Sequence, residues 1–596
     1  MKPFYTPHPD PHSYFRSDQP QMTHLDWTAR INFNRHTLHC EAKITFNRGG
    51  VVDLDTRNLR AISVRNADGD AIPHDQDSVQ TPVGSRLYVA VPVQHPMVII
   101  RYRTQPTASG LQWTQAQHTA GGTHPFLYSQ AAFDHARSFI PCQDTPGVRF
   151  TFTAELQVPG HLKSLMAAQA QASFFRDGDR VDRWTMSHPI PAYLLAFAVG
   201  DLASRPLSDR VTAWTEPCLS DAAAYEFADV EKMITAAEEL FGKDPWGRFD
   251  LLVPPPNFPY GGMENPTLVF VTPTLLAGDR SMVGTLAHEL AHAWTGNLVT
   301  NATWGDLWIN EGWTTYAEWR ILEACYGSEA ALIRMALLER EFHEDCMLFS
   351  DTPELTALCP NLRGRNLDDV YSRVPYFKGA MFLLALECVV GRERFDAFIQ
   401  KYIETFAFKS LDTATFLDFV HANLPGAIER TQAWRWVYGP FLPETHAKIT
   451  STLLDEVIGC ITQRRIPTRS EGEKWTVQQW IFFLRNFPRP ATIDELECLG
   501  YGYALSESRN LKLRWAFLLL ASDSQDGRFW PEIETFVGNV GQTGLLKPLY
   551  RSISAHFGMD RSRGLYVKMS DRYHPITQHV VSQMLSGMAP VTPAAV

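Results

Sequence analysis

His288-Glu-Leu-Ala-His292 is the stretch around which the rest of the chain is organised. Residues four apart on a helix lie almost above one another, so His288 and His292 would project from the same face. Two neutral imidazoles at this spacing can hold a zinc ion, and the intervening Glu289 can then reach a water molecule on the metal. The motif therefore predicts a zinc site with its own general base.

A third ligand is expected further along the chain. Catalytic zinc sites use three protein ligands and leave one position for water, whereas structural sites use four protein ligands. Glu311 follows His292 by nineteen residues and would begin a second helix that reaches about Tyr326. Glu318 lies seven residues further along on the same face, from which it can hydrogen-bond a ligand imidazole.

Composition restricts the class of protein. The 596 residues are 45% hydrophobic and 20% charged, which is typical of globular domains. A net charge of -11 argues against nucleic acid and anionic membranes as partners. No signal peptide or run of eighteen apolar residues is found, and nine scattered cysteines indicate reduced thiols. These features predict a cytoplasmic protein.

The character of the sequence changes along its length. Residues 1–201 contain short alternating or β-branched runs and predict an all-β domain. Residues 202–443 mix helices and strands around the metal motif, and 444–455 are expected to be a linker. Residues 456–596 consist of short amphipathic helices, which predict a helical, repeat-like domain. The predicted fold class is multidomain α+β.

A glycine-containing segment precedes the metal motif. It comprises Tyr260, Gly261, Gly262, Met263 and Glu264, followed by Asn-Pro. The two glycines allow close backbone approach to a ligand, and the prolines that flank the segment favour an extended conformation. Because it ends twenty-four residues before His288, we expect it to be a substrate-binding strand that carries an acid.

The chain closely resembles the zinc aminopeptidases, and in particular the branch of leukotriene A(4) hydrolase and aminopeptidase B. The resemblance rests on the Gly-Gly-Met-Glu-Asn block in 255–266, on 270–278, and on the His-Glu-x-x-His run in 288–301. It extends to 141–146, 374–379 and 547–551, and so covers most of the chain. It implies an N-terminal β saddle, a thermolysin-like zinc catalytic domain and a C-terminal α-helical domain.

The resemblance also assigns roles at the metal. One zinc per chain would be held by His288, His292 and Glu311, with Glu289 as general base. Glu264 would bind the free α-amine of the substrate. The implied activity is zinc-dependent removal of the N-terminal residue from peptides, by Glu-assisted attack of a zinc-bound water.

Further residues match the family near the substrate. Tyr376 matches the tyrosine that stabilises the tetrahedral intermediate, and Tyr371 matches a neighbour that lines the site. Gln130 matches a glutamine near the amine pocket, and Asp368 matches an aspartate used in epoxide opening. The expected partners are peptides with a free N-terminus, and the chain is expected to be a monomer.

Two other functions compete with this one. An enzyme that also opens a lipid epoxide is favoured by Asp368 and Tyr371. It is opposed by Gln542 and Gly544, because the family places a carboxylate-binding arginine and lysine there. A catalytically inactive scaffold that uses its helical domain is the other alternative. It is opposed by the presence of all three ligands and the base.

Overall fold

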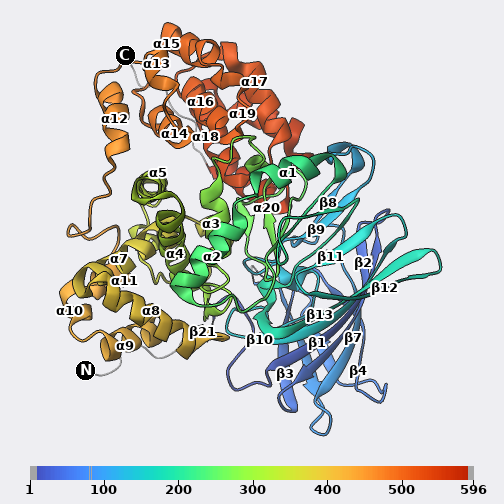
Figure 1. Ribbon diagram of the computed structural model, residues 1–596. Coiled ribbons are helices and arrows are strands. Elements are labelled where there is room, and N and C mark those ends of the chain that lie inside the picture. The colour runs from blue at the N-terminus through green and yellow to red at the C-terminus, as the bar shows by residue number, and fades with distance from the viewer. Residues whose placement is uncertain (1–9, 80, 82, 588–596) are drawn as a thin grey trace.

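The computed structural model describes residues 10–79, 81 and 83–587, which form three parts in chain order (Figure 1). The first part is all-β, the second mixes a small sheet with helices, and the third is helical. This order of parts confirms the fold class expected from sequence. The boundaries given above stay predictions, and the two ends of the chain lie outside the described residues.

The N-terminal part is built on a seven-stranded sheet in which β1 pairs parallel with β10 and antiparallel with β2. Along β10 every second side chain is buried, which is the period that a strand imposes. In order across the sheet, the strands are β12 (Gln169–Arg176), β13 (Asp179–Pro191), β10 (Arg149–Pro159), β1 (Met22–Asn32), β2 (Thr37–Phe46), β7 (Met97–Arg103) and β4 (Arg60–Arg65).

Two smaller sheets complete this part. One has the order β3 (Gly50–Thr56), β6 (Ser85–Val91) and β5 (His74–Gln76). The other has the order β11 (Lys163–Met166), β14 (Phe197–Gly200), β9 (Phe126–Ser129) and β8 (Leu111–Thr114). Directly after β9, the Gln130 side chain contacts Met263 of the central part.

The central part, which carries the metal motif, contains a five-stranded sheet, a two-stranded sheet and most of the longer helices. The larger sheet has the order β15 (Ala203–Pro206), β16 (Thr212–Thr215), β17 (Asp250–Leu252), β19 (Leu268–Val271) and β18 (Gly262–Met263). The smaller sheet pairs β20 (Val299–Asn301) with β21 (Lys409–Leu411). The helices are α1 (Ser220–Glu226), α2 (Val230–Phe241), α3 (Val283–Ala291), α4 (Trp308–Tyr326), α5 (Ser328–Leu348), α6 (Leu367–Val370), α7 (Gly379–Val390), α8 (Arg392–Phe406), α9 (Thr413–Asn423), α10 (Ala427–Thr431) and α11 (Ala433–Val437).

One helix expected from sequence is interrupted. The pattern predicts a single helix over 222–241, but α1 ends at Glu226 and α2 begins at Val230. The Glu226 carboxylate accepts hydrogen bonds from the backbone N–H groups of Gly278 and Arg280. This contact with a distant loop fixes the chain at the break, and a local pattern cannot reveal it.

The C-terminal part is a layer of helices with its own apolar core, to which Ile333 and Ala336 of α5 also contribute. Its helices are α12 (Asp455–Thr462), α13 (Arg469–Gly472), α14 (Val477–Asn486), α15 (Ile493–Glu497), α16 (Leu511–Asp523), α17 (Trp530–Asn539), α18 (Thr543–Phe557), α19 (Met559–Met569) and α20 (Pro575–Gly587). Within the described part of the chain, no helix is both long and apolar enough to span a bilayer.

Candidate active site

Helices α3 and α4 bring three potential metal ligands together. His288 lies in the last turn of α3, and His292 directly follows that helix. Glu311 Oε2 lies 3.3 Å from His288 Nε2 and 3.6 Å from His292 Nε2. Ligand atoms of the three residues all lie within 4.8 Å of one another. Two imidazole nitrogens and one carboxylate are a donor set that suits zinc.

The Nδ1 atoms of both imidazoles have hydrogen-bond partners within the chain. His288 Nδ1 lies 3.0 Å from Glu318 Oε2, and Glu318 in turn accepts a 2.6 Å hydrogen bond from Arg334. His292 Nδ1 lies 3.1 Å from the carbonyl oxygen of Thr295. These contacts leave each Nε2 facing Glu311. Such bonds orient the ligands of metal sites, so the residues present fit a zinc ion.

The position of Glu311 is set by tight helix packing. Fifteen of the nineteen residues of α4 are buried, which makes it a core helix. Gly312 lies so close to α7 that a Cβ there would come 2.7 Å from the Cα of Gly379. Glycine at these two positions lets α4 and α7 approach each other beside Glu311.

Glu289 lies between the two histidines and is buried against the glycine segment. A Cβ at Gly262 would come 2.2 Å from Glu289 Oε1. Strand β18, which contains Gly262 and Met263, pairs antiparallel with β19 and is held there. Burial raises the pKa of Glu289 well above its usual value. This carboxyl group is therefore suited to accept and hold a proton.

Glu264 follows β18 and is also buried. Asn297 donates a 2.6 Å hydrogen bond to its backbone carbonyl. Ligand atoms of Glu264, Glu289 and His292 lie within 4.8 Å of one another. Burial and then the charge of Glu311 raise the pKa of Glu264 to about 8. Among the described residues, no lysine or arginine forms an ion pair with Glu264, so a cation from outside the chain could pair with this group and favour its carboxylate form.

Tyr376 reaches the potential ligand Glu311 from a π-helical turn at Val374–Lys378. Its hydroxyl donates a 2.9 Å hydrogen bond to Glu311 Oε1 and lies 3.1 Å from the Tyr371 hydroxyl. Arg373 donates to the Tyr371 hydroxyl at 3.2 Å and lies over the Tyr376 ring. Sequence reasoning missed Arg373, although it stands between the two tyrosines that it contacts.

The remaining glycine-segment residues and Gln130 occupy different places. Tyr260 and Gly261 line the cavity at the potential metal ligands, as do Gly262, Met263 and Glu264. Gln130 does not line this cavity, but its amide lies 3.2 Å from the Met263 sulfur, while its own Oε1 is buried without a partner among the described residues. Gln130 therefore contacts the site through Met263.

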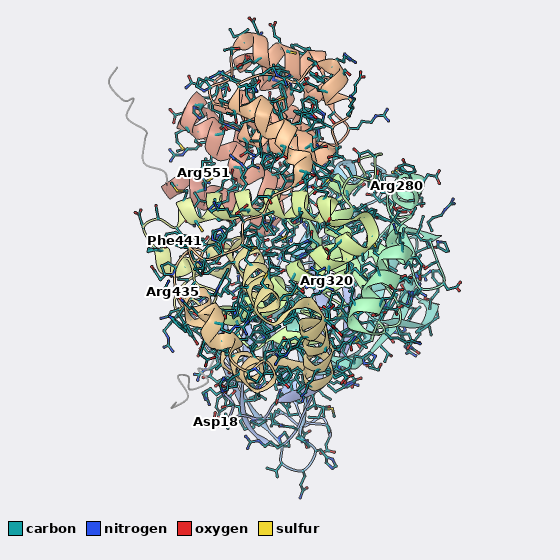
Figure 2. The ribbon with its side chains drawn as sticks, turned by 60° about the vertical axis from the view of Figure 1, so that its left-hand side comes forward. Asp18, Arg280, Arg320, Arg435, Phe441 and Arg551 are labelled. Carbon is teal, nitrogen blue, oxygen red and sulfur yellow. The ribbon has the colours of Figure 1, made fainter. Side chains whose placement is uncertain are left out.

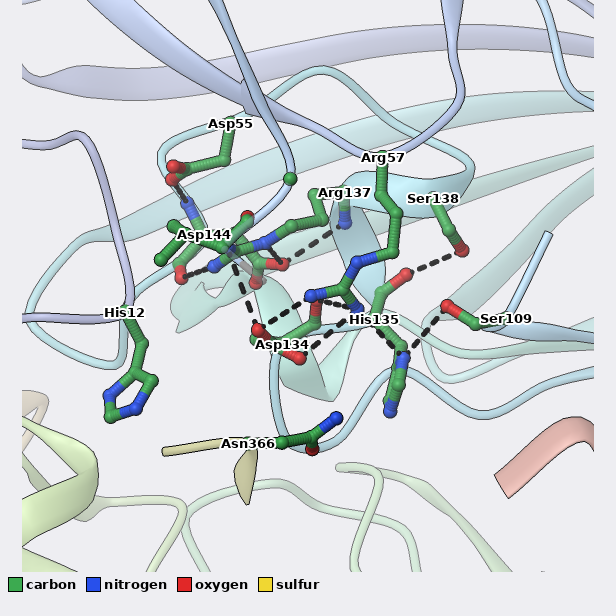
Figure 3. Close-up of polar contacts among 12 residues, drawn as sticks. His12, Asp55, Arg57, Ser109, Asp134, His135, Arg137, Ser138, Asp144 and Asn366 are labelled. Carbon is green, nitrogen blue, oxygen red and sulfur yellow. Dashed lines mark hydrogen bonds and ion pairs between the residues drawn. The ribbon is translucent and has the colours of Figure 1, made fainter. Parts of the chain in front are cut away.

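Asp368 lies at the start of α6 and is held from the N-terminal part. Its Oδ2 lies 3.1 Å from His135 Nε2. The loop that carries His135 is fixed by ion pairs of Arg57 with Asp134 at 2.8 Å and of Arg137 with Asp144 at 2.9 Å, as Figure 3 shows. Asp368 is thus anchored across the boundary between two parts of the chain.

Two adjoining cavities meet at this site. The cavity at the metal ligands has a volume of about 120 Å³, and the cavity beyond it, toward the C-terminal helices, has about 560 Å³. Tyr371, Arg373, Lys512 and Gln542 line both. Gln542 accepts a 3.3 Å hydrogen bond from Thr274 and carries no charge into the junction.

Three family models match consecutive segments of the chain. Residues 21–194 match the peptidase M1 N-terminal domain, and residues 225–434 match the peptidase family M1 domain. Residues 475–585 match the C-terminal domain of leukotriene A4 hydrolase.

Whole-length relatives agree with these matches. The chain is 33% identical to leukotriene A-4 hydrolase of Xenopus laevis, over 97% of this chain and 99% of that protein. The chain belongs to the M1 peptidase family. It is also 33% identical to leucine aminopeptidase 2 of Pyricularia oryzae, over 97% and 98% of the two chains. The structure of yeast LTA4 hydrolase in complex with bestatin covers 98% of both chains at 30% identity, with a TM-score of 0.89.

Family membership settles the class of enzyme. The matched M1 domain contains all three potential ligands and Glu289, and the M1 peptidases are zinc-dependent aminopeptidases. This M1 chain is therefore a zinc metallo-aminopeptidase, a hydrolase that acts on peptides.

Proposed function

We propose that His288, His292 and Glu311 hold one zinc ion per chain, and that the enzyme releases single residues from peptides with a free N-terminus. Both groups of potential ligands among the described residues share His292, which supports a single ion. When bound, zinc would supply a Lewis acid for the scissile carbonyl and lower the pKa of the attacking water.

The chain's own groups would move the proton. Glu289 takes a proton from the attacking water and returns it to the leaving amine, which restores the carboxylate for the next cycle. The Tyr376 hydroxyl donates to the developing oxyanion after exchanging its bond to Glu311. Tyr371 and Arg373 orient Tyr376 for this task, since Tyr371 can donate to it once Arg373 donates to Tyr371.

The observation that carries the exopeptidase proposal is the buried Glu264 carboxyl group beside Glu289, which has no cationic partner among the described residues. An ion pair between Glu264 and the substrate α-ammonium would place the first peptide carbonyl at the base and the metal. An internal stretch of a peptide lacks this charge and would not be held in register. Binding would also satisfy a buried acid that no lysine or arginine of the described residues neutralises.

Glu264→Ala tests this proposal. The variant should lose about 100-fold or more in kcat/KM on a leucyl amide with a free amine, because a buried charge pair is removed. Its low activity on the N-acetylated substrate should change little. Equal losses on both substrates would contradict the amine-binding role.

A second activity on a lipid epoxide has one supporting feature. Asp368 and Tyr371 both line the larger cavity, whose volume of about 560 Å³ can hold an extended ligand. An assay with an allylic epoxide, with Asp368→Asn as the comparison, separates this activity from peptide hydrolysis.

We further propose a cytoplasmic monomer that acts without nucleic acid or membrane partners. The net charge of -11 supports the second part of this proposal. All nine cysteines are free thiols, in agreement with a reducing compartment.

A further inference from the structure

The larger cavity contains positive charge that the chain itself does not neutralise. It lies between α5 of the catalytic part and helices α16 and α18 of the C-terminal part. Lys512 of α16 and Lys547 and Arg551 of α18 line it, and Figure 2 labels Arg551 on the C-terminal helices. Among the described residues, none of these three cations has an acidic partner within ion-pair distance.

Most of the other charged side chains around the cavity form ion pairs within the chain. Arg334 binds Glu318 at 2.6 Å, and Arg373 binds Glu341 at 2.9 Å. Glu344 binds Arg340 at 3.1 Å and also contacts Arg485. The two acids whose charges act on Lys512, Glu318 and Glu341, are thus each paired with an arginine.

Lys512 differs from the other two cations in its place and surroundings. The charge of Asp345 acts on both Lys547 and Arg551 and partly offsets them. Lys512 instead lies near Arg334 and Arg373 as well as Glu341 and Glu318. It also lines the cavity at the metal ligands, whereas Lys547 and Arg551 line only the larger one. Of the three cations without an ion-pair partner, Lys512 is therefore the one that a substrate bound at the metal ligands would contact first.

We propose that Lys512 binds a carboxylate on the distal part of the peptide substrate. This inference rests on the proposed function, because it takes the substrate N-terminus to lie at Glu264. The carboxylate would be either the C-terminus of a short peptide or an acidic side chain of a longer one. Gln542 and Gly544 offer no cation near this junction, so Lys512 supplies the charge from a different helix.

The shape of the cavity suits this assignment. Tyr371 and Arg373 line both cavities, so a peptide held at Glu264 can extend past them into the larger one. Leu337, Ile481 and Trp515 provide apolar walls for side chains along the way. A carboxylate that arrives at Lys512 replaces water there with a charge-assisted hydrogen bond.

Binding measurements on zinc-loaded Glu289→Gln protein test the proposal without turnover. The ligands are di-, tri- and tetrapeptides that begin with leucine, each as the free acid and as the C-terminal amide. A matching amide with aspartate as its last residue separates the side-chain source from the C-terminal one. We expect at least one carboxylate form to bind about tenfold or more tightly than its neutral amide.

Substitutions then locate the preference. Adding Lys512→Met should bring the ratio of acid to amide affinity close to one, whereas Lys512→Arg should retain most of it. Lys401→Met, at an exposed position on α8, is the matched control and should keep the full ratio. Equal affinities for acids and amides, or a ratio that survives Lys512→Met, would overturn the proposal. Wild-type turnover of the neutral peptide amides, which exclude the aspartate-containing one, reports on the proposed function separately, since these amides lack a carboxylate.

Discussion

Gly262 and Glu289 approach so closely that a Cβ on residue 262 would lie 2.2 Å from the Glu289 carboxylate. The glycine segment therefore forms one wall of the pocket for the general base. The glycine segment at 260–264 and the His-Glu-x-x-His motif at 288–292, which lie apart in the chain, contact each other here.

Replacing Gly262 with alanine should displace the Glu289 carboxylate. We expect kcat/KM to fall by about 100-fold, since a shift of about 1 Å at a catalytic group costs this much. Gly261→Ala is the comparison, because a Cβ there meets its nearest atom at 3.6 Å. Steady-state kinetics on a leucyl amide measure both variants. Similar losses in the two would show that the contact with Glu289 is not responsible.

Glu318→Ala should weaken zinc binding. Its carboxylate lies 3.0 Å from His288 Nδ1. Loss of such a contact typically lowers metal affinity by about 10- to 100-fold. Competition with a chelator measures this affinity. Glu323→Ala, on the same helix but paired with Arg392 at 2.6 Å, should bind zinc like the wild type. An unchanged affinity in Glu318→Ala would contradict the orienting role.

Much of the architecture follows from local signals. The apolar stripe over 477–486 predicts a helix, and α14 occupies Val477–Asn486, where Thr476 and Gln479 cap its start reciprocally. The metal motif is also local, because the spacing of His288 and His292 fixes their common face. In contrast, the pattern over Ile449–Gln463 predicts a longer helix than α12, which begins only at Asp455.

The supporting residues of the site could not be predicted from local pattern. Arg334 reaches Glu318 from another helix, and Lys512 reaches the cavity from the C-terminal part. Charged residues at such positions look like ordinary exposed ones in the sequence. Only the folded arrangement shows which of them have partners and which face a cavity.

Tyr376→Phe should lower kcat by about 100- to 1,000-fold with little change in KM, because the lost donor acts on charge that develops in the transition state. Tyr371→Phe should have a smaller effect, since its hydroxyl acts through Tyr376 at 3.1 Å. Steady-state kinetics give kcat for each variant, and the two values are compared. A large rise in KM with unchanged kcat in Tyr376→Phe would assign the residue to substrate binding.

The preference for a carboxylate should depend on pH. Burial and then Arg334 lower the pKa of Lys512 to about 8, so its positive charge is present below this pH and is lost above it. The ratio of acid to amide affinity should therefore decline as pH rises through 8. Titration of the peptide amine affects both forms and cancels in the ratio. A ratio that is constant up to pH 10 would show that another group binds the carboxylate.

The most direct test is the metal content of the purified protein measured together with its activity. We expect one zinc per chain in the wild type and in Glu289→Gln, with peptide hydrolysis nearly abolished in that variant. We expect loss of both zinc and activity in Glu311→Ala. Wild-type protein that hydrolyses leucyl amides without bound metal, or Glu289→Gln protein that retains full turnover, would contradict the proposed zinc mechanism.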